Sequence, residues 1–304
     1  MIEAGVETRR LEGIWRRLPE LPEVETVRRG LEPYLVGRKI TAVRVVVPKM
    51  LKGPVADPDE FTQSVIGKTI TAIRRRGKYL IFDLDSGYHL LFHLKMRGHM
   101  RVVPRHTPDD KYLALGITVG ANQVGEDDAS PRESYEMRFH DIWTWGEARL
   151  LDTDELQSHP SLSAMGVEPL SASFSGETLR TSLSRRPKTA VKAALLDQGV
   201  LAGVGNIYAD ESLFRSGILP YRPAGELTST ETETLSQEIR AVLTEAIGDG
   251  GTVSDNFFDT GGSPGRYVPQ VYDRGGQPCI RCGTTLVRTR IGGRGTVYCP
   301  NCQK

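Results

Sequence analysis

The sequence predicts an α+β protein with a β-rich N-terminal domain, built as a sandwich or a barrel, and a helical C-terminal domain that ends in a small cysteine hairpin. Strand-like runs separated by turn residues fill positions 37–151, and such spacing is typical of a sandwich or barrel. Helical periodicity replaces them from about residue 175 to residue 250. With 304 residues the chain is long enough for two hydrophobic cores.

Composition is that of an ordinary soluble globular protein. Hydrophobic residues make up 38% of the chain and charged residues 25%, and no run approaches the ~20 apolar residues that a membrane span requires. Residues 1–18 contain four Arg but no continuous apolar core, so they do not resemble a secretory signal. We therefore expect a cytoplasmic location and no membrane partner.

Net charge gives no argument for a nucleic-acid partner. The formal net charge is +1, and residues 1–18 contribute four Arg and three Glu, so the remainder of the chain is neutral. Any such argument must come from local basic clusters, and isolated charge runs are more often solvated surface. Three clusters are present, at 74–78, at 185–192 and at 279–304.

Four runs carry the strand pattern most clearly. Aliphatic and β-branched residues dominate them, and turn residues stand between them. The polar and acidic stretch 120–134 is expected to be a long hairpin loop without a chemical role. The four runs cover 40–47, 69–76, 79–84 and 89–94.

Strand-like runs stop at about residue 152, and this change sets the expected domain boundaries. The predicted domains are an N-terminal domain over 19–151, a linker over 152–174, a helical domain over 175–264 and a cysteine hairpin over 265–304.

The clearest helix runs from Leu227 to Ile247. Leu235, Ile239 and Leu243 recur within it every four residues and define one apolar face. Thr228 or Ser229 is expected to cap its N-terminus.

The cysteines form two Cys-x2-Cys pairs separated by sixteen residues. This spacing is typical of a tetrahedral site in which four thiolates hold one zinc ion. Two disulfides or a redox dithiol are the alternatives, and a cytoplasmic chain disfavours the first. A four-thiolate site has no open coordination position, so the zinc would be structural and would clamp a hairpin over 285–298. The predicted ligands are Cys279, Cys282, Cys299 and Cys302.

A glycine-rich run predicts a tight turn between two helices. Gly199, Gly203 and Gly205 form the turn, and the second helix is expected to begin near Asn206 with free N–H groups ready for a phosphate. A dinucleotide fingerprint is disfavoured because Tyr208 occupies its third glycine position and no strand precedes the turn. A phosphate loop would require a following Gly-Lys-Ser/Thr, which is absent. A plain helical hairpin remains open.

An amphipathic helix with a proline-rich entry is predicted close to the N-terminus. Pro22 suits a first helical turn, and Glu23 lies near the positive end of the helix dipole. Val24, Val27 and Leu31 recur at helical spacing and define one apolar face.

Three stretches carry a family resemblance: Pro-Glu-Leu-Pro-Glu-Val-Glu-Thr-Val-Arg-Arg-Gly-Leu from Pro19, the run from Gln198 to Phe214, and Gly-Arg-Gly-Thr-Val-Tyr-Cys from Gly293. They resemble the formamidopyrimidine-DNA glycosylases, bacterial base-excision repair enzymes for oxidised purines. The resemblance covers roughly residues 19–304. It implies a β-sandwich flanked by helices, a helix–two-turn–helix domain and a zinc hairpin. It also implies a monomer whose partner is double-stranded DNA containing oxidised purines or abasic sites.

The resemblance implies four catalytic residues. The amine of Pro19 would attack the sugar C1′ and form an iminium, and Glu20 would move protons at the sugar. Strand cleavage by β- and then δ-elimination would follow. Lys78 and Arg294 match the family's phosphate-gripping lysine and arginine.

Pro19 can act in this way only as the first residue of the mature chain. A proline nitrogen inside a chain is a tertiary amide whose lone pair is delocalised into the carbonyl. Leu18 stands where the family has its initiator Met, and the leucine codons TTG and CTG can start translation in bacteria. We therefore expect residues 1–18 to be an upstream extension that is absent from the mature protein.

Further DNA contacts are implied by the same resemblance. Asn206 would bind a phosphate, Lys188 is favoured over Lys192 as a backbone contact, and Met96 would fill the space left by the flipped base. The segment from Asp141 to Gly146 departs from the family, which has an Arg and a Phe where Trp143 and Trp145 stand. Trp145 can still stack in the duplex.

Trp143 is the more consequential of these two departures. The family Arg reads the orphaned base, and Trp143 cannot offer an arginine's paired donors to cytosine. The preference for the base opposite the lesion is therefore not predicted by the resemblance.

Two other functions remain as alternatives. One is a zinc-stabilised DNA-binding protein without lyase activity, which gains weight if the first eighteen residues are retained. The other is a glycosylase for oxidised pyrimidines, although that branch typically has Gly where Leu21 stands.

Overall fold

The described residues of the computed structural model are 18–120, 133–254 and 257–304. The extension up to residue 17 and most of the expected loop over 120–134 lie outside them. No helix among the described residues combines the length and the apolar character needed to cross a membrane.

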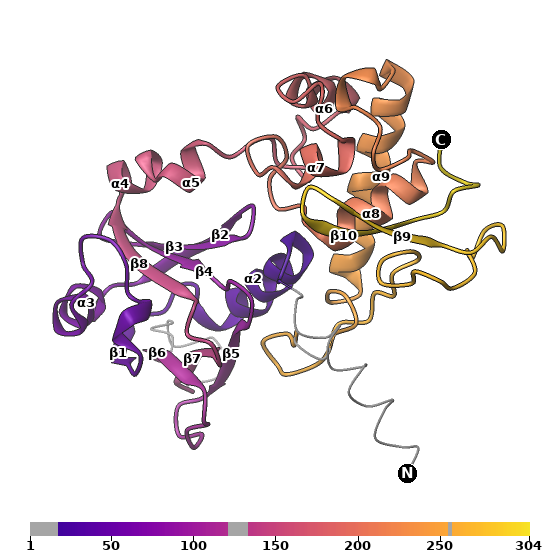
Figure 1. Ribbon diagram of the computed structural model, residues 1–304. Helices are drawn as coiled ribbons and strands as arrows, with labels where there is room; N and C mark the ends of the chain where they lie inside the picture. The colour runs from indigo at the N-terminus through magenta and orange to yellow at the C-terminus, as the bar shows by residue number, and fades with distance from the viewer. Residues whose placement is uncertain (1–17, 121–132, 255–256) are drawn as a thin grey trace, which may run out of the picture. The chain divides into compact units, whose positions relative to one another are not determined.

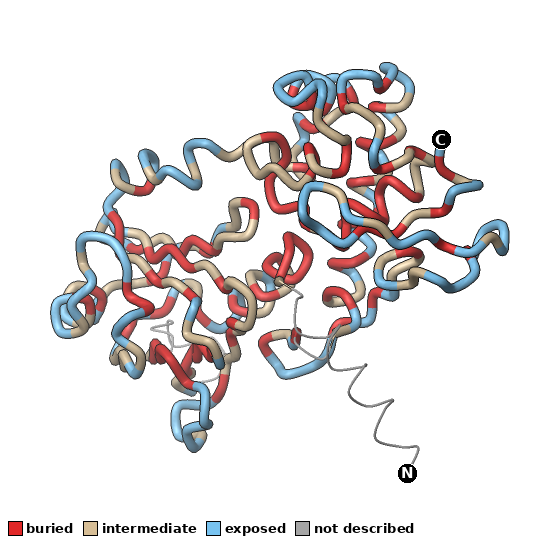
Figure 2. Tube along the Cα trace, in the orientation of Figure 1, coloured by how far each residue is buried: buried red, intermediate tan, exposed pale blue. Residues whose placement is uncertain are grey.

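The chain forms two compact units, each with its own hydrophobic core. The sandwich unit comprises Pro19, Glu23–His159 and Val253–Gly265. The helical unit comprises Glu20–Pro22, Pro160–Thr252 and Arg266–Lys304. Figure 2 shows that buried residues concentrate on the strands of the first unit and on the helices of the second.

Two four-stranded sheets make up the sandwich unit, and all their pairings are antiparallel (Figure 1). The first sheet has the order β1-β6-β7-β5 and the second the order β2-β3-β4-β8. The predicted sandwich is confirmed. The strands are β1 (Ile40–Val45), β2 (Ile70–Arg76), β3 (Tyr79–Leu84), β4 (Tyr88–His93), β5 (Gly98–Pro104), β6 (Leu113–Val119), β7 (Tyr135–Asp141) and β8 (Glu147–Asp152).

The four predicted runs correspond to β1–β4, whereas β5–β8 were not predicted individually. Every residue of β6 is buried, so its sequence lacks the alternation that marks a half-exposed strand. β7 carries the buried polar residues Glu136, Arg138 and His140. The Arg138 side chain is satisfied by the Glu136 carboxylate at 2.7 Å and by the Pro108 carbonyl at 2.8 Å.

Helices cover parts of the sandwich core. On α2 (Leu21–Leu35), the predicted apolar residues Val24, Val27 and Leu31 are fully buried in the core that both sheets share. The unit also contains η1 (Pro48–Met50), α3 (Pro58–Val65) and α4 (Thr153–Ser158).

The helical unit is built around its longest helix, α9 (Ser229–Gly248). The predicted residues Leu235, Ile239 and Leu243 are fully buried. Thr228 caps the helix in a reciprocal arrangement with Glu231. The other elements are α5 (Pro160–Ser163), α6 (Gly176–Leu183), α7 (Val191–Leu196), α8 (Asn206–Arg215), η2 (Ala224–Glu226), β9 (Val287–Ile291) and β10 (Arg294–Tyr298).

The two units divide the chain differently from the predicted domains. Glu20–Pro22, predicted in the N-terminal domain, belongs to the helical unit, and the predicted linker over 152–174 is divided between the units after His159. The segment Val253–Gly265, predicted in the helical domain except for its last residue, belongs to the sandwich unit. There Phe257 joins the core, and the Val102 N–H donates to the Thr260 carbonyl at 3.1 Å. The cysteine hairpin, predicted as a domain of its own, belongs to the helical unit.

Two turns of the sandwich unit are held against the same aromatic ring. A Cβ atom at Gly98 or at Gly146 would lie 2.5 Å from an atom of the Phe139 ring. Only glycine lets the backbone approach the ring this closely. The turn before β5 and the turn after β7 are thereby fixed to the core.

Gly146→Ala should therefore destabilise the sandwich unit. The added methyl group forces the buried Phe139 ring to move, and such overpacking costs about 1–3 kcal/mol of the free energy of unfolding. Denaturant unfolding measures the loss. The control is Gly248→Ala, whose Cβ meets no heavy atom within 4 Å and which should be neutral or slightly stabilising. Equal losses in the two variants would contradict the packing argument.

Candidate functional site

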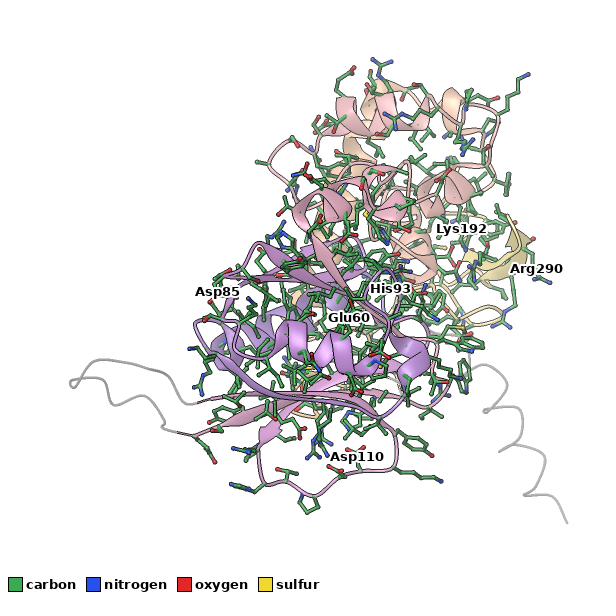
Figure 3. The ribbon with its side chains drawn as sticks, turned by 90° about the vertical axis from the view of Figure 1, so that its left-hand side faces the viewer. Glu60, Asp85, His93, Asp110, Lys192 and Arg290 are labelled. Atoms are coloured by element: carbon green, nitrogen blue, oxygen red, sulfur yellow. The ribbon has the colours of Figure 1, made fainter. Side chains whose placement is uncertain are left out.

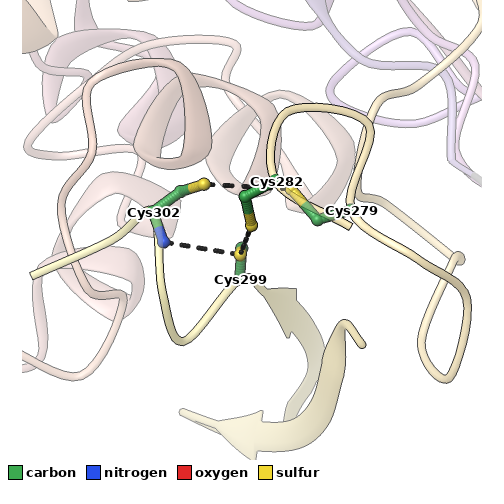
Figure 4. Close-up of side chains that lie close together, drawn as sticks. All are labelled: Cys279, Cys282, Cys299 and Cys302. Carbon is green, nitrogen blue, oxygen red and sulfur yellow. Dashed lines mark hydrogen bonds between the residues drawn. The ribbon is translucent and has the colours of Figure 1, made fainter. Parts of the chain in front are cut away.

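Four cysteine sulfurs converge at the base of the β9–β10 hairpin (Figure 4). All four lie within 4.8 Å of one another. The Cys279 and Cys302 sulfurs are 3.9 Å apart, and those of Cys282 and Cys299 are 3.5 Å apart. The two knuckle turns point backbone N–H groups at sulfur, since Arg281 N–H donates to Cys279 Sγ and Cys302 N–H to Cys299 Sγ, both at 3.4 Å.

This donor set fits a zinc ion. Four thiolates with zinc–sulfur bonds of about 2.3 Å in a tetrahedron place their sulfurs about 3.8 Å apart. Disulfide-bonded sulfurs would lie at about 2.05 Å, and all four thiols are free. The predicted structural zinc site is confirmed, and it leaves no coordination position for a substrate.

The hairpin presents one arginine at its tip. Gly292 and Gly293 adopt positive φ values of 56° and 76°, and the exposed Arg294 follows as the first residue of β10. Glycine favours such a turn because it adopts positive φ without strain. The predicted phosphate contact is therefore accessible.

A buried ion pair fastens the hairpin to the helices of its own unit. Lys192 of α7 and Asp210 of α8 are fully buried, with Nζ 2.7 Å from Oδ1. The same Nζ donates to the Gly295 carbonyl at 2.7 Å and to Thr296 Oγ1 at 2.8 Å. Asp210 Oδ2 accepts from the Val297 N–H at 3.1 Å. The backbone that follows the tip is thus held by both charges.

Burial dominates the electrostatics of this pair. Loss of water lowers the pKa of Lys192, with the Asp210 and Glu20 carboxylates acting in the opposite direction and Arg294 adding to the lowering. Loss of water raises the pKa of Asp210 to about 7, and Lys192 opposes that rise. Glu20, Lys192 and Arg294 are therefore electrostatic neighbours within the helical unit, where Figure 3 labels Lys192.

Glu20 occupies the N-terminus of α8. Its Oε2 accepts from the Gly205 N–H at 2.8 Å and its Oε1 from the Ile207 N–H at 3.0 Å. The expectation that these N–H groups are free for a phosphate was wrong, because the chain's own carboxylate binds them. Asn206 begins α8 as predicted, and within the described residues its buried Oδ1 has no hydrogen-bond partner.

The glycines of the turn before α8 make room for this carboxylate. A Cβ at Gly205 would lie 2.5 Å from Glu20 Oε1. A Cβ at Gly203, which has a φ of 79°, would lie 2.8 Å from the Leu21 side chain, and the Gly203 carbonyl accepts from the Leu21 N–H at 3.0 Å. Close packing of residues 20 and 21 therefore explains the glycine spacing.

Pro19 immediately precedes this fixed glutamate and is buried. Of the four predicted catalytic residues, only Pro19 depends on where the mature chain begins. Its nitrogen is a reactive amine at a chain terminus and an unreactive amide inside a chain.

The other predicted residues of the helical unit are placed differently. Lys188 is exposed in the connection between α6 and α7, as a backbone contact requires. Lys192, which the sequence ranked below it, is buried and structural. A single lysine in the apolar run of α7 was the signal that could have revealed this role.

Lys78 lies in the tight turn between β2 and β3. The neighbouring strand carries His93, whose pKa burial lowers to about 3, with Lys95 and Lys78 adding to the effect. Lys78 therefore contributes positive charge at this end of the second sheet, where Figure 3 labels His93.

Met96, Trp143 and Trp145 come from two turns at the same end of the adjacent strands β5 and β7 of the first sheet. Met96 lies in the turn before β5, and both tryptophans lie in the turn after β7. The ring centroids of Trp143 and Trp145 are 5.0 Å apart. Arg97, which the sequence did not single out, lies over the Trp143 ring with its guanidinium carbon 5.2 Å from the centroid.

Three family models together match most of the chain. The formamidopyrimidine-DNA glycosylase N-terminal domain matches residues 18–148, and the formamidopyrimidine-DNA glycosylase H2TH domain matches residues 165–257. The zinc finger found in FPG and IleRS matches residues 276–304.

Similar proteins cover the chain almost throughout. A formamidopyrimidine-DNA glycosylase of Geobacillus kaustophilus is 41% identical over 94% of this chain and 100% of its own length. One from Hahella chejuensis is likewise 41% identical, with the same coverage.

Two solved structures extend the similarity to the fold. The Lactococcus lactis Fpg in complex with abasic-site DNA has a TM-score of 0.80 at 33% identity, covering 94% of this chain and 99% of its own. MutM in complex with DNA containing carbocyclic 8-oxo-G has a TM-score of 0.79 at 33% identity, covering 94% of this chain and 100% of its own. With its sandwich, its turn before α8 and its zinc hairpin, this chain belongs to the formamidopyrimidine-DNA glycosylase family.

Proposed function

We propose that the chain removes oxidised purines from double-stranded DNA and then cleaves the abasic strand, with the amine of Pro19 as the nucleophile. The observation that carries the proposal is the position of Glu20, which follows Pro19 directly and has both carboxylate oxygens fixed at the start of α8. Similar structures contain abasic, Fapy-dG and 8-oxo-G DNA, which supports the class of substrate.

The proposed nucleophile requires that the mature chain begin at Pro19. The match to the family's N-terminal domain starts at residue 18, which supports removal of the residues before Pro19.

Base release then proceeds by displacement at the sugar. The lone pair of the Pro19 nitrogen forms a bond to C1′, and the bond from C1′ to the base breaks with its electrons passing to the base, which takes up a proton. The bond from C1′ to the ring oxygen opens as that oxygen takes a proton, and this leaves an iminium at C1′. Glu20 accepts the proton that the Pro19 nitrogen loses and delivers one to the ring oxygen.

Strand cleavage follows from the charge of the iminium. Positive charge at C1′ acidifies the C2′ protons, so loss of one proton expels the 3′ phosphate with its bonding electrons. A second elimination along the conjugated chain expels the 5′ phosphate. Hydrolysis of the iminium frees the amine.

Four polar residues are proposed to bind the phosphates on either side of the damaged nucleotide. Arg294 and Lys188 are exposed in the helical unit, Asn206 begins α8, and Lys78 supplies charge from the sandwich unit. Phosphate contacts position the duplex without reading its sequence, which suits an enzyme that must act wherever damage occurs.

A zinc-stabilised DNA-binding protein without lyase activity is the second candidate. It would apply if residues 1–18 were retained, because the nitrogen of an internal Pro19 is an amide that cannot attack. The phosphate-binding residues would remain functional in that case.

Borohydride trapping on a duplex that contains 8-oxoguanine tests the nucleophile. A chain that begins at Pro19 should form a covalent adduct, because borohydride reduces the iminium to a stable amine. A chain that retains residues 1–18 should form none, since its Pro19 nitrogen is an amide. Equal trapping by both chains would show that another group attacks, and the intact mass of the native protein establishes which form exists in the cell.

Removal of the zinc should release the hairpin that presents Arg294 and should therefore weaken DNA binding. We expect Cys282→Ser to lower the affinity for an abasic-analogue duplex about 10- to 100-fold, the value of a charge-assisted contact. Titration of binding and the zinc content per chain measure the effect. Unfolding of the sandwich unit should stay unchanged, and an undiminished affinity without zinc would contradict the clamping role.

Lys188→Gln should reduce affinity uniformly across DNA sequences. Loss of one phosphate contact decreases the salt dependence, the slope of log K against log salt, by about 1. The matched control is Lys52→Gln, an exposed lysine of the sandwich unit, which should leave the slope unchanged. Identical slopes for both variants would remove Lys188 from the interface.

A further inference from the structure

Two turns of the sandwich unit emerge side by side because of the strand register. β5 begins at Gly98, β7 ends at Asp141, and these two residues are directly paired. The turn before β5 therefore lies next to the turn after β7. Both are anchored on the Phe139 ring through Gly98 and Gly146, as described above.

The turn after β7 has a fixed backbone. The Asp141 carboxylate accepts from the Trp143 N–H at 3.0 Å and from the Gly146 N–H at 2.6 Å. Thr144 adopts a φ of 54°, a conformation that non-glycine residues adopt only when their surroundings enforce it. Trp143 therefore has a defined position before any DNA is bound.

Arg97 and the two tryptophans form one contiguous cluster. The Arg97 guanidinium lies 5.2 Å from the Trp143 ring centroid, within the range of a cation–π contact. The Trp143 and Trp145 rings are 5.0 Å apart and inclined by 52°. Trp145 is 55% exposed, which is unusual for a residue of its size. Exposed aromatic rings beside a guanidinium are the groups on which unpaired bases stack.

We propose that Arg97, oriented by the Trp143 ring, reads the base opposite the lesion. This inference rests on the proposed function, because a base loses its partner only when the damaged nucleotide leaves the duplex. Trp143 has a single ring N–H donor, whereas a guanidinium has five donors in a fixed fork. Arg97, in the turn before β5, thus supplies the paired N–H donors that Trp143, in the turn after β7, lacks.

The chemistry of the orphaned base makes Arg97 selective for cytosine. The pairing edge of cytosine presents two adjacent acceptors, N3 and O2, which accept two parallel N–H groups. Adenine presents one acceptor, N1, beside an amino donor that opposes the second N–H group. A bidentate contact of this kind discriminates against the wrong base by about 5- to 150-fold.

Two measurements with opposing bases test the inference. The first is the single-turnover rate of 8-oxoguanine release opposite cytosine and opposite adenine. The second is the affinity for an abasic-analogue duplex with the same two opposing bases. We expect the protein to favour cytosine in both, Arg97→Gln to bring both ratios close to one, and Arg97→Lys to give intermediate ratios because an ammonium cannot donate as a fork.

Matched variants separate the reading role from charge and from folding. Arg105→Gln removes the same charge from an exposed position just beyond the other end of β5 and should leave the ratios unchanged. Trp143→Leu removes the ring under Arg97 and should lower both cytosine-to-adenine ratios, that of base release and that of affinity. Adding Trp143→Arg to Arg97→Gln should restore the preference for cytosine, a rescue that a merely structural role of Arg97 would not give.

The outcomes distinguish this inference from the proposed function. Activity with unchanged ratios in Arg97→Gln, or activity without any preference for cytosine in the parent protein, overturns the reading role alone. A parent protein that neither releases the base nor binds the abasic duplex overturns the proposed function, and the reading role with it.

Discussion

The contact between the Glu20 carboxylate and the start of α8 is the constraint on which the candidate site depends. A buried carboxylate is costly unless N–H groups replace its water, and here two helix N–H groups donate to its two oxygens. The helix dipole adds favourable potential at the same point. Because Pro19 is the preceding residue, a fixed Glu20 restricts where the Pro19 nitrogen can lie.

The same contact organises the charges behind it. Lys192 lies close enough for Glu20 to affect its pKa, and its ammonium binds the Asp210 carboxylate and the backbone that follows Arg294. Removing one member of such a buried pair leaves an uncompensated charge. The zinc site holds the two strands of the hairpin, whereas this ion pair holds the hairpin on α7 and α8.

Patterns that depend on neighbouring residues were readable from the sequence, and long-range partners were not. The four-residue repeat of α9, its cap at Thr228 and the cysteine spacing are local signals, and the structure confirms each of them. Glu20 is bound by residues 185 and 187 positions away, so its sequence neighbours carry no trace of the contact. β6 is buried along its whole length, and its pattern could not be told from any other apolar run.

The turn before β5 and the turn after β7 are positioned by contacts outside the side chains of Arg97 and Trp143. Gly98 is paired with Asp141 in the sheet, and Gly98 and Gly146 pack against the Phe139 ring. A guanidinium lost from position 143 can therefore be supplied from position 97, provided that something holds the longer side chain in one direction. The Trp143 ring meets that requirement, because a cation–π contact lowers the entropy that an unrestrained arginine would lose on meeting a base.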